Sequence, residues 1–429
     1  MGVTLTHYPS ALAYLFARTT GAYKFGLERT SALLAELGDP HLAFPVIHIA
    51  GTNGKGSSVA TAEALLRARG LRVARYTSPH LVDFRERIVV NGEPIAAEQV
   101  VTFIDEWTPA VERIGASFFE ATTALAFDHF ARARIDVALV ETGLGGRLDS
   151  TNVVRPIAAG VTSIGFDHME YLGTSLEAIA REKAGIFKAG VPAVIGEGDP
   201  EVRAWLARDA KHAGASPIRI VVEESEATQF AVSGLGTEFT LRALGDERVV
   251  GTPLVGRHQA DNFAFALTLL DAAGGRFRVP LAEAVESVRA VRLPGRFQRV
   301  GRWIFDVAHN ADGARTVAAS LESVEHESPV VAVLCVLGDK DWRAMLDVLA
   351  PVVTSFVLTD APTAPASRAW PLAEVATYAT TKGYPFVAEP DFDRALRLAE
   401  QESATTLVTG SFHTVGDAMA RLQVSPLTG

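Results

Sequence analysis

The chain has 429 residues, a length that favours two domains over a single core. Its formal net charge of −10 argues against nucleic acid as the main partner. No apolar run reaches the ~18 residues of a membrane span, and no secretory signal is expected at the N-terminus. Cys335 is the single cysteine, which excludes an internal disulfide and favours a reducing, cytoplasmic environment.

Apolar, β-branched runs alternate with helical patterns, and this order predicts an α/β fold with a mainly parallel sheet. Helix 261–273 is expected to follow a hairpin-like stretch over residues 218–255. Strands are predicted in chain order at residues 46–50, 72–76, 137–141, 158–163 and 193–196. The helices between them are predicted at residues 57–69, 97–114, 120–134 and 175–187.

A Pro-Gly break within Val-Arg-Leu-Pro-Gly-Arg-Phe (291–297) separates this series from a second one. We place a domain boundary near residue 296, between a large N-terminal and a smaller C-terminal domain. The Pro/Ala-rich residues 360–371 are predicted to form a surface loop. Strands of the second domain are predicted at residues 303–306, 330–336, 355–359 and 406–409.

Residues 47–58, Ile-His-Ile-Ala-Gly-Thr-Asn-Gly-Lys-Gly-Ser-Ser, join an apolar strand to a helix through a glycine-rich loop. Glycines let backbone N–H groups approach phosphate, Lys55 adds a positive charge, and the helix dipole attracts anions. The loop departs from the common phosphate loop, because Ile49 replaces its first glycine and Gly56 stands where a hydroxyl is usual. A simple turn is the alternative, but the lysine and hydroxyls inside the loop favour a nucleotide phosphate site.

Polar side chains follow several predicted strands, at the edge where ligands of open α/β sheets bind. Glu141 ends one strand beside a glycine-rich turn and suits Mg²⁺ bridging phosphates, with a capping or salt-bridged glutamate as an equal alternative. Asp167 and His168 follow the next strand, and His168 is a candidate metal or phosphate contact. Ser78 is either a hydroxyl ligand of a metal or, in the simpler interpretation, a turn residue before proline.

Other polar residues have a structural explanation in the local sequence. Lys183 lies near a helix C-terminus, where positive charge is favourable. Asp261 or Asn262 would cap the helix that begins there. By contrast, Arg296 and Asp306 flank the predicted boundary, and such a pair suits a nucleotide in an interdomain cleft whose closure assembles the site.

In combination and order, these segments resemble the folylpolyglutamate synthase family, including its bifunctional dihydrofolate synthase members. The resemblance extends over nearly the whole chain. The shared motifs are Gly-Thr-Asn-Gly-Lys-Gly-Ser (51–57), Thr-Ser-Pro-His-Leu (77–81), Glu-Thr-Gly-Leu-Gly-Gly-Arg-Leu-Asp-Ser-Thr-Asn (141–152), Asp-His (167–168), Tyr-Leu-Gly (171–173), Arg-Glu-Lys-Ala-Gly-Ile-Phe (181–187), Leu-Pro-Gly-Arg-Phe (293–297), Phe-Asp-Val-Ala-His-Asn (305–310) and Gly-Ser-Phe-His-Thr-Val (410–415).

The resemblance implies a Mur-ligase-like ATPase domain over residues 1–295 and a Rossmann-like glutamate-ligase domain over residues 296–429. It also implies an ATP-dependent amide ligase. The substrate carboxylate would attack the γ-phosphate to give an acyl phosphate, from which the amine of L-glutamate displaces phosphate. The substrates would be dihydropteroate and reduced folates. ATP and two Mg²⁺ ions would be needed, with room for a monovalent cation, and the enzyme would be a monomer.

Residue roles follow from the matching motif positions. Lys55, His168 and Lys183 would be catalytic; Ser78 and Glu141 would hold one Mg²⁺ and His168 a second, and Lys183 would react with CO₂ to give a carbamate that organises the metals. The nucleotide would be contacted by Asn53, Gly54, Lys55, Gly56, Ser57, Asn262, Arg296, Asp306 and His309. The pteroate pocket would be bordered by Tyr23, Lys24, Phe25, Phe118, Phe119, Glu120, Ala121, Leu148, Asp149 and Ser150.

Three alternatives remain beside the bifunctional enzyme. A monofunctional folylpolyglutamate synthase would differ only in its substrate pocket. A peptidoglycan Mur ligase needs a UDP-binding domain before the phosphate loop, and the loop begins at Gly51, which leaves too little chain for one. A regulatory nucleotide-binding module would give Glu141, His168 and Lys183 no shared purpose.

Overall fold

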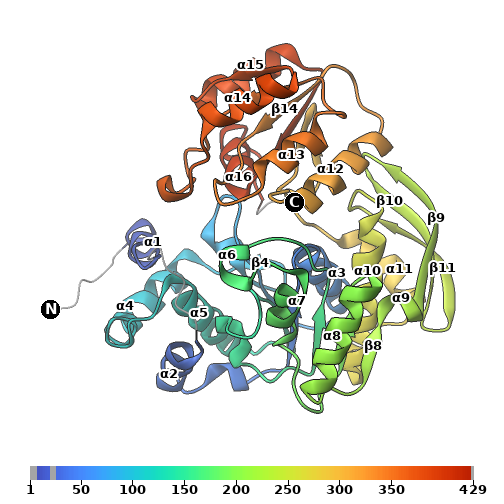
Figure 1. Ribbon diagram of the computed structural model, residues 1–429. Coiled ribbons are helices and arrows are strands. Elements are labelled where there is room, and N and C mark those ends of the chain that lie inside the picture. Colours follow the sequence, from blue (N-terminus) through green and yellow to red (C-terminus); the bar gives the residue numbers. More distant parts are fainter. Residues whose placement is uncertain (1–6, 20–25, 427–429) are drawn as a thin grey trace.

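The computed structural model describes residues 7–19 and 26–426, and two lobes stand one above the other in Figure 1. The N-terminal lobe holds an eight-stranded sheet in the order β4-β3-β2-β5-β1-β6-β7-β8, parallel from β2 to β8. Its strands are β1 (Val46–Ala50), β2 (Val73–Tyr76), β3 (Ile88–Val90), β4 (Glu93–Pro94), β5 (Val137–Glu141), β6 (Ala158–Val161), β7 (Ala193–Ile195) and β8 (Ile218–Ile220).

Helices cover both faces of this sheet because successive strand residues point to opposite sides. Ile47 and Ile49 of β1 belong to the core under helices α3 and α10, whereas Val46 packs on the other side with α2, α4 and α5. The helices of this lobe are α1 (Tyr8–Ala17), α2 (Glu28–Glu36), α3 (Lys55–Ala68), α4 (Ala97–Ile114), α5 (Phe118–Ala133), α6 (Met169–Leu172), α7 (Leu176–Ala184), α8 (Pro200–His212), α9 (Val221–Glu224), α10 (His258–Ala273) and α11 (Leu281–Ser287).

The hairpin-like stretch is a three-stranded antiparallel sheet of β9 (Ser225–Ser233), β10 (Gly236–Ala243) and β11 (Asp246–Thr252), at the right of Figure 1. Phe239 of β10 is fully buried and meets Phe263 of α10 edge to face, with ring centroids 6.0 Å apart. This contact fastens the small sheet to the helix that borders the phosphate loop.

The C-terminal lobe, residues 298–421, holds a six-stranded sheet in the order β12-β13-β17-β14-β15-β16, parallel except for β12. Helices α12, α13 and α14 cover one face, and α15 and α16 cover the other. The elements are β12 (Gln298–Val300), β13 (Trp303–Phe305), β14 (Val330–Leu334), β15 (Ser355–Leu358), β16 (Phe386–Ala388), β17 (Thr405–Thr409), α12 (Ala311–Ser323), α13 (Trp342–Leu349), α14 (Leu372–Lys382), α15 (Phe392–Glu402) and α16 (Phe412–Arg421). A boundary near residue 296 stays a prediction.

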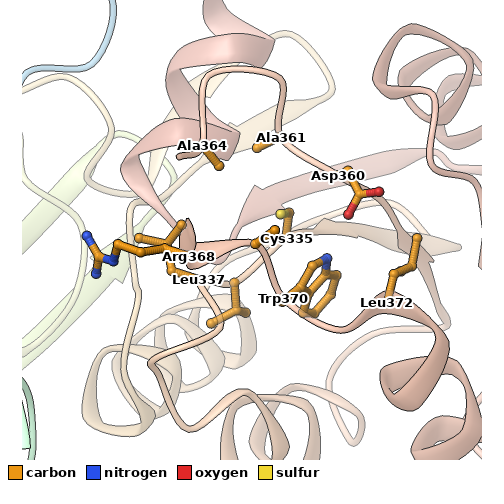
Figure 2. Close-up of a pocket in the computed structure, with 10 residues that line it drawn as sticks. Cys335, Leu337, Asp360, Ala361, Ala364, Arg368, Trp370 and Leu372 are labelled. Carbon is orange, nitrogen blue, oxygen red and sulfur yellow. The ribbon is translucent and has the colours of Figure 1, made fainter. Parts of the chain in front are cut away.

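The predicted α/β fold with a mainly parallel sheet is confirmed, and one local expectation, the capping of α10, is wrong. Helix α10 begins at His258 with Arg257 at its N-cap, so Asp261 lies inside the first turn, Asn262 follows it, and neither residue caps the helix. Residues 360–371 form the predicted loop and most of them are exposed, although Trp370 is buried and donates from Nε1 to the Thr359 carbonyl (2.9 Å). This loop lines a cavity of about 290 Å³ beside Cys335 and Asp360 (Figure 2).

In the part of the chain that the structure describes, no helix has both the length and the apolar character needed to cross a membrane.

Candidate active site

The predicted phosphate loop connects β1 to α3, and its lysine opens the helix rather than preceding it. Gly51 and Gly54 have φ of +149° and +86°, a region that favours glycine. A Cβ at Gly54 would also stand 2.4 Å from Oδ1 of Asn262. The residue after β6 also holds the loop in place, because the Thr162 hydroxyl donates to the Asn53 carbonyl (2.7 Å). The glycine-rich loop, its lysine and the helix N-terminus are therefore arranged as an anion site requires, and the anion-binding role itself stays a prediction.

Two lysines converge on one carbonyl of this loop. Lys55 Nζ donates to the Gly51 oxygen (2.9 Å), and Lys183 Nζ, which arrives from α7, donates to the same oxygen (2.8 Å). Lys183 is 5% exposed, and burial, followed by the charge of Lys55, lowers its pKa to about 7. Stabilisation of the α7 C-terminus does not account for the position of Lys183, because its amine donates a hydrogen bond to Gly51 of the phosphate loop and not to the carbonyls that end α7.

Glu141 and Ser78 lie beside these lysines. The Glu141 carboxylate is 5% exposed and stands 3.7 Å from Lys55 Nζ. Burial raises the pKa of Glu141, while Lys55, Arg296 and the backbone N–H of Ser78 lower it. The structure shows the salt-bridged alternative for Glu141, a buried carboxylate paired with Lys55 at a strand end, and the metal-ligand role stays a prediction.

The donor set fits one Mg²⁺ better than two. Among the described residues, no three His, Cys, Asp or Glu side chains gather to hold a metal. A carboxylate with a nearby serine nonetheless suits Mg²⁺, which is commonly held by one or two carboxylates together with substrate phosphates. At the second place, Lys340 Nζ stands 3.4 Å from His168 Nε2, so a metal on this nitrogen would require Lys340 to move.

Among the nucleotide candidates of the second half, Arg296 and Asp306 lie near each other and near Glu141, whereas Asn262 borders Gly54. Arg296 is half-buried beside the phosphate loop, where a Cβ on Gly56 would lie 3.8 Å from its Nη2. Burial lowers the pKa of Arg296, and Asp306 and Glu141 act against this. Asp306 accepts the backbone N–H groups of Phe297 (2.8 Å) and Ala308 (2.9 Å), which fixes the start of the C-terminal lobe.

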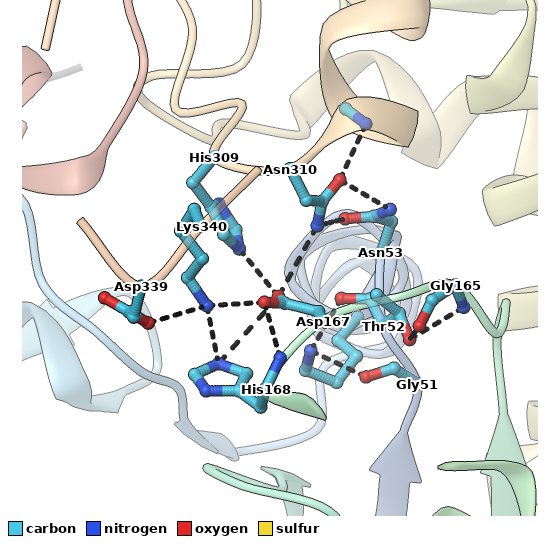
Figure 3. A network of polar contacts seen from close by, with 12 residues as sticks. Gly51, Thr52, Asn53, Gly165, Asp167, His168, His309, Asn310, Asp339 and Lys340 are labelled. Carbon is cyan, nitrogen blue, oxygen red and sulfur yellow. Dashed lines mark hydrogen bonds and ion pairs between the residues drawn. The ribbon is translucent and has the colours of Figure 1, made fainter. Parts of the chain in front are cut away.

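A polar network joins the two lobes at Asp167 (Figure 3). Its carboxylate contacts Lys340, stands 3.3 Å from His309 Nε2, and accepts from the amide of Asn310 (3.5 Å). Burial by itself would raise the pKa of Asp167, but His309, His168 and Lys340 hold it below its usual range. Asn310 Nδ2 also donates to Asn53 Oδ1 (3.2 Å), so the network reaches the phosphate loop.

The sequence analysis missed Lys340, Asn310 and His258. Lys340 belongs to Gly-Asp-Lys-Asp (338–341), which follows the buried strand β14, so the strand-end rule applied there would have found it. His258 adjoins Gln259, whose side-chain oxygen accepts from Asn262 (2.9 Å). Nothing in the local sequence distinguishes it.

The residues predicted to border the pteroate pocket have mixed positions. Phe118 and Phe119 are half-buried at the start of α5, and Phe16 stacks on Phe118 with centroids 5.3 Å apart. Glu120 is 1% exposed and its carboxylate is already paired with Arg29 (2.9 Å). Ala121 is buried behind it, and Tyr23, Lys24 and Phe25 lie outside the described residues.

Asp149 shapes the glycine-rich turn that follows Glu141. Its carboxylate accepts the N–H groups of Gly143 (2.9 Å), Leu144 (2.8 Å) and Thr151 (3.0 Å). Burial raises its pKa, and these hydrogen bonds lower it. Leu148 is half-buried and Ser150 is buried beside it.

Known proteins share this architecture. Residues 49–270 match the model of the Mur ligase middle domain, and residues 295–412 match that of the Mur ligase glutamate ligase domain. The chain is 37% identical to the dihydrofolate synthase/folylpolyglutamate synthase of Escherichia coli (strain K12), over 96% of this chain and 94% of that one. It resembles the E. coli FolC structure in complex with DHPP and ADP (TM-score 0.87, 32% identity, 99% of both chains). A bifunctional folylpolyglutamate synthase/dihydrofolate synthase with Mn, AMPPNP and L-glutamate bound is similar (TM-score 0.85, 32% identity, 98% of this chain and 99% of that one). The chain therefore belongs to the dihydrofolate synthase/folylpolyglutamate synthase family of Mur-ligase-like proteins.

Proposed function

We propose that the protein is an ATP-dependent amide ligase that adds L-glutamate to dihydropteroate and to reduced folates through an acyl phosphate. The observation that carries this proposal is the convergence of Lys55 and Lys183 on the Gly51 carbonyl, beside the buried Glu141. Phosphoryl transfer depends mainly on positioning and charge neutralisation, which such a cluster supplies. Relatives that hold DHPP with ADP, and AMPPNP with L-glutamate, support these substrates.

Each residue has one task in this proposal. Residues 53–57 cradle the ATP phosphates, and Arg296, Asp306 and Asn262 hold the rest of the nucleotide. When bound, Mg²⁺ neutralises phosphate charge, and Ser78 and Glu141 are the groups that would hold it. The contacts of His309 and Lys340 with Asp167 support a closed cleft that protects the acyl phosphate from water.

Lys183 is proposed to act as a carbamate. Its neutral amine attacks the carbon of CO₂, an N–C bond forms, one proton leaves to solvent, and the product carries one negative charge. The position of Lys183 beside the phosphate loop and close to Glu141 supports this role, because a carbamate would add oxygen ligands where metal-bound phosphates must be organised. His168 is proposed to contact the second metal with Lys340 turned away from His168 Nε2 and still paired with Asp167.

The pocket for the pteroate is proposed to lie along the start of α5 and the turn after β5. Phe118 and Phe119 offer flat apolar surfaces there, and residues 148–150 form the facing edge. Tyr23, Lys24 and Phe25 remain candidates. We also propose a monomer in the cytoplasm with no nucleic acid or membrane partner, supported by the acidic composition and by the buried, unpaired Cys335.

Phosphate release tests the function and separates the two substrate ranges. We expect the purified protein to release phosphate from ATP when L-glutamate is supplied with dihydropteroate, with tetrahydrofolate or with methylene-tetrahydrofolate. Release only with the reduced folates would leave a monofunctional folylpolyglutamate synthase. Loss of ATP hydrolysis in every mixture would favour a nucleotide-binding module instead.

A further inference from the structure

The loop that carries Ser78 crosses from the N-terminal lobe to the C-terminal lobe. Leu81, three residues beyond Ser78, packs against the hydrophobic cluster formed by β13, β17, α15 and α16, together with Phe412 and Leu422. In Figure 1 the corresponding light-blue loop rises from the lower lobe toward α16. Leu81 is thus a half-buried side chain of one lobe that packs against the core of the other.

Two glycines of the chain make room for Leu81. The backbone of Gly416 in α16 lies so close that a Cβ there would stand 2.0 Å from the Leu81 carbonyl oxygen. On the other side, a Cβ at Gly295 would stand 3.2 Å from Leu81 Cδ1. Gly295 has φ of +69° and belongs to the Pro-Gly break where the chain passes into the C-terminal lobe. Leu81 therefore lies between Gly295, in the segment that connects the two lobes, and Gly416 of helix α16 in the C-terminal lobe.

The rest of the loop is held rigidly. The Glu86 carboxylate accepts the backbone N–H groups of Leu81 (2.8 Å), Val82 (2.8 Å) and Asp83 (2.6 Å). Arg87 Nε donates to Nδ1 of His80 (2.8 Å), and the N–H of Ser78 faces Glu141. A shift of Leu81 would consequently be passed to Ser78 instead of being absorbed by a flexible segment.

We infer that Leu81 is a positioning residue, through which the C-terminal lobe sets the place of Ser78 beside Glu141. The inference rests on the proposed function, in which Ser78 and Glu141 hold Mg²⁺ on the nucleotide. The position of α16 then decides whether the metal-binding pair is assembled, so lobe closure and the phosphate site act as one unit. Small displacements matter at such a site, since about 1 Å of misplacement can cost on the order of 100-fold in rate.

Leu81→Ala tests this inference against a matched control. Leu422 is also half-buried and packs on the same cluster, but it belongs to the C-terminal lobe alone, so Leu422→Ala removes similar packing without touching the loop. We expect Leu81→Ala to lower kcat about 10-fold or more, with Leu422→Ala close to wild type at a similar Tm. Leu81→Met, which refills the space, should restore most of the rate. Equal kcat in Leu81→Ala and Leu422→Ala would overturn the inference.

Gly416→Ala tests the same contact from the other lobe. Alanine has a higher helix propensity than glycine. If the contact with Leu81 is unimportant, Gly416→Ala should therefore raise Tm or leave it unchanged. We expect instead a fall in kcat of similar size to that of Leu81→Ala, because the added methyl pushes the loop away. Wild-type kcat in Gly416→Ala would contradict the inference.

Calorimetry of ADP binding separates this inference from the proposed ligase activity. We expect Mg²⁺ to tighten ADP binding to the wild type and to have a weaker effect on Leu81→Ala, with ADP affinity in the absence of Mg²⁺ unchanged. This measurement needs no folate or glutamate, so a wrong substrate assignment would leave it intact. An unchanged effect of Mg²⁺ in Leu81→Ala would overturn the positioning role even if the ligase assay succeeds.

Discussion

Lys183→Ala is expected to lower ligation at least about 1000-fold while leaving the fold intact, since a loss of this size is typical when a preorganised charged group is removed from a transition state. The fold should survive because the Gly51 carbonyl keeps the hydrogen bond from Lys55. Burial also disfavours the ammonium form of Lys183, so its removal relieves a desolvation cost. Phosphate release and a thermal melt would measure both effects.

Lys188→Ala is the matched control. Lys188 lies five residues beyond Lys183 and is half-buried, but its Nζ reaches only the Asn152 carbonyl, at 3.4 Å. We expect Lys188→Ala to ligate like the wild type. In ¹³CO₂-saturated buffer, the wild type and Lys188→Ala should show a carbamate carbon resonance that Lys183→Ala lacks. Retained ligation in Lys183→Ala would refute the carbamate assignment.

The sequence was most informative where a local pattern decides the structure. Helix 97–114 and strands 46–50 and 137–141 were predicted with the observed bounds, because each is a clear apolar pattern between turn signals. The sequence does not predict helix α1, because this helix buries only Ala11 and Leu15 and its apolar pattern is weak. The helices of the C-terminal lobe were implied by its strands without being located.

The site was predictable only in part, because some of its contacts join distant segments. The rule for α/β sheets pointed to Glu141 and Ser78 as residues at strand ends, while a structural role remained an equal alternative for Glu141 and the simpler interpretation for Ser78. Lys183 is 132 residues from its partner Gly51, and only the family resemblance pointed to its role. Lys340 was missed because its partner, Asp167, lies 173 residues earlier and in the other lobe.

Lys340→Ala is expected to have the second-largest effect, a fall in kcat of about 100-fold, as for other misplacements at a closed site. Lys340 and Asp167 are 6% and 7% exposed and form a buried ion pair across the lobes (Figure 3). Removing one partner of such a pair costs about 3–5 kcal/mol, because the remaining charge is left buried. The Asp167 carboxylate can be hydrated again only if the lobes separate. Part of this free-energy cost should therefore shift the protein toward an open cleft, which lowers kcat.

Charge and position can be separated with two further variants and a surface control. Lys340→Arg keeps the charge and should retain more activity than Lys340→Ala. The double variant Lys340→Met/Asp167→Asn removes both charges of the buried pair. Its Tm should therefore exceed that of Lys340→Ala, in which the Asp167 charge remains. Lys382 pairs with Asp347 at 3.2 Å on the surface of the same lobe, and Lys382→Ala should change stability by less than about 1 kcal/mol. If Lys340→Ala matches Lys382→Ala in Tm and kcat, the buried pair does not hold the lobes together, and closure must depend on other contacts such as that of Leu81.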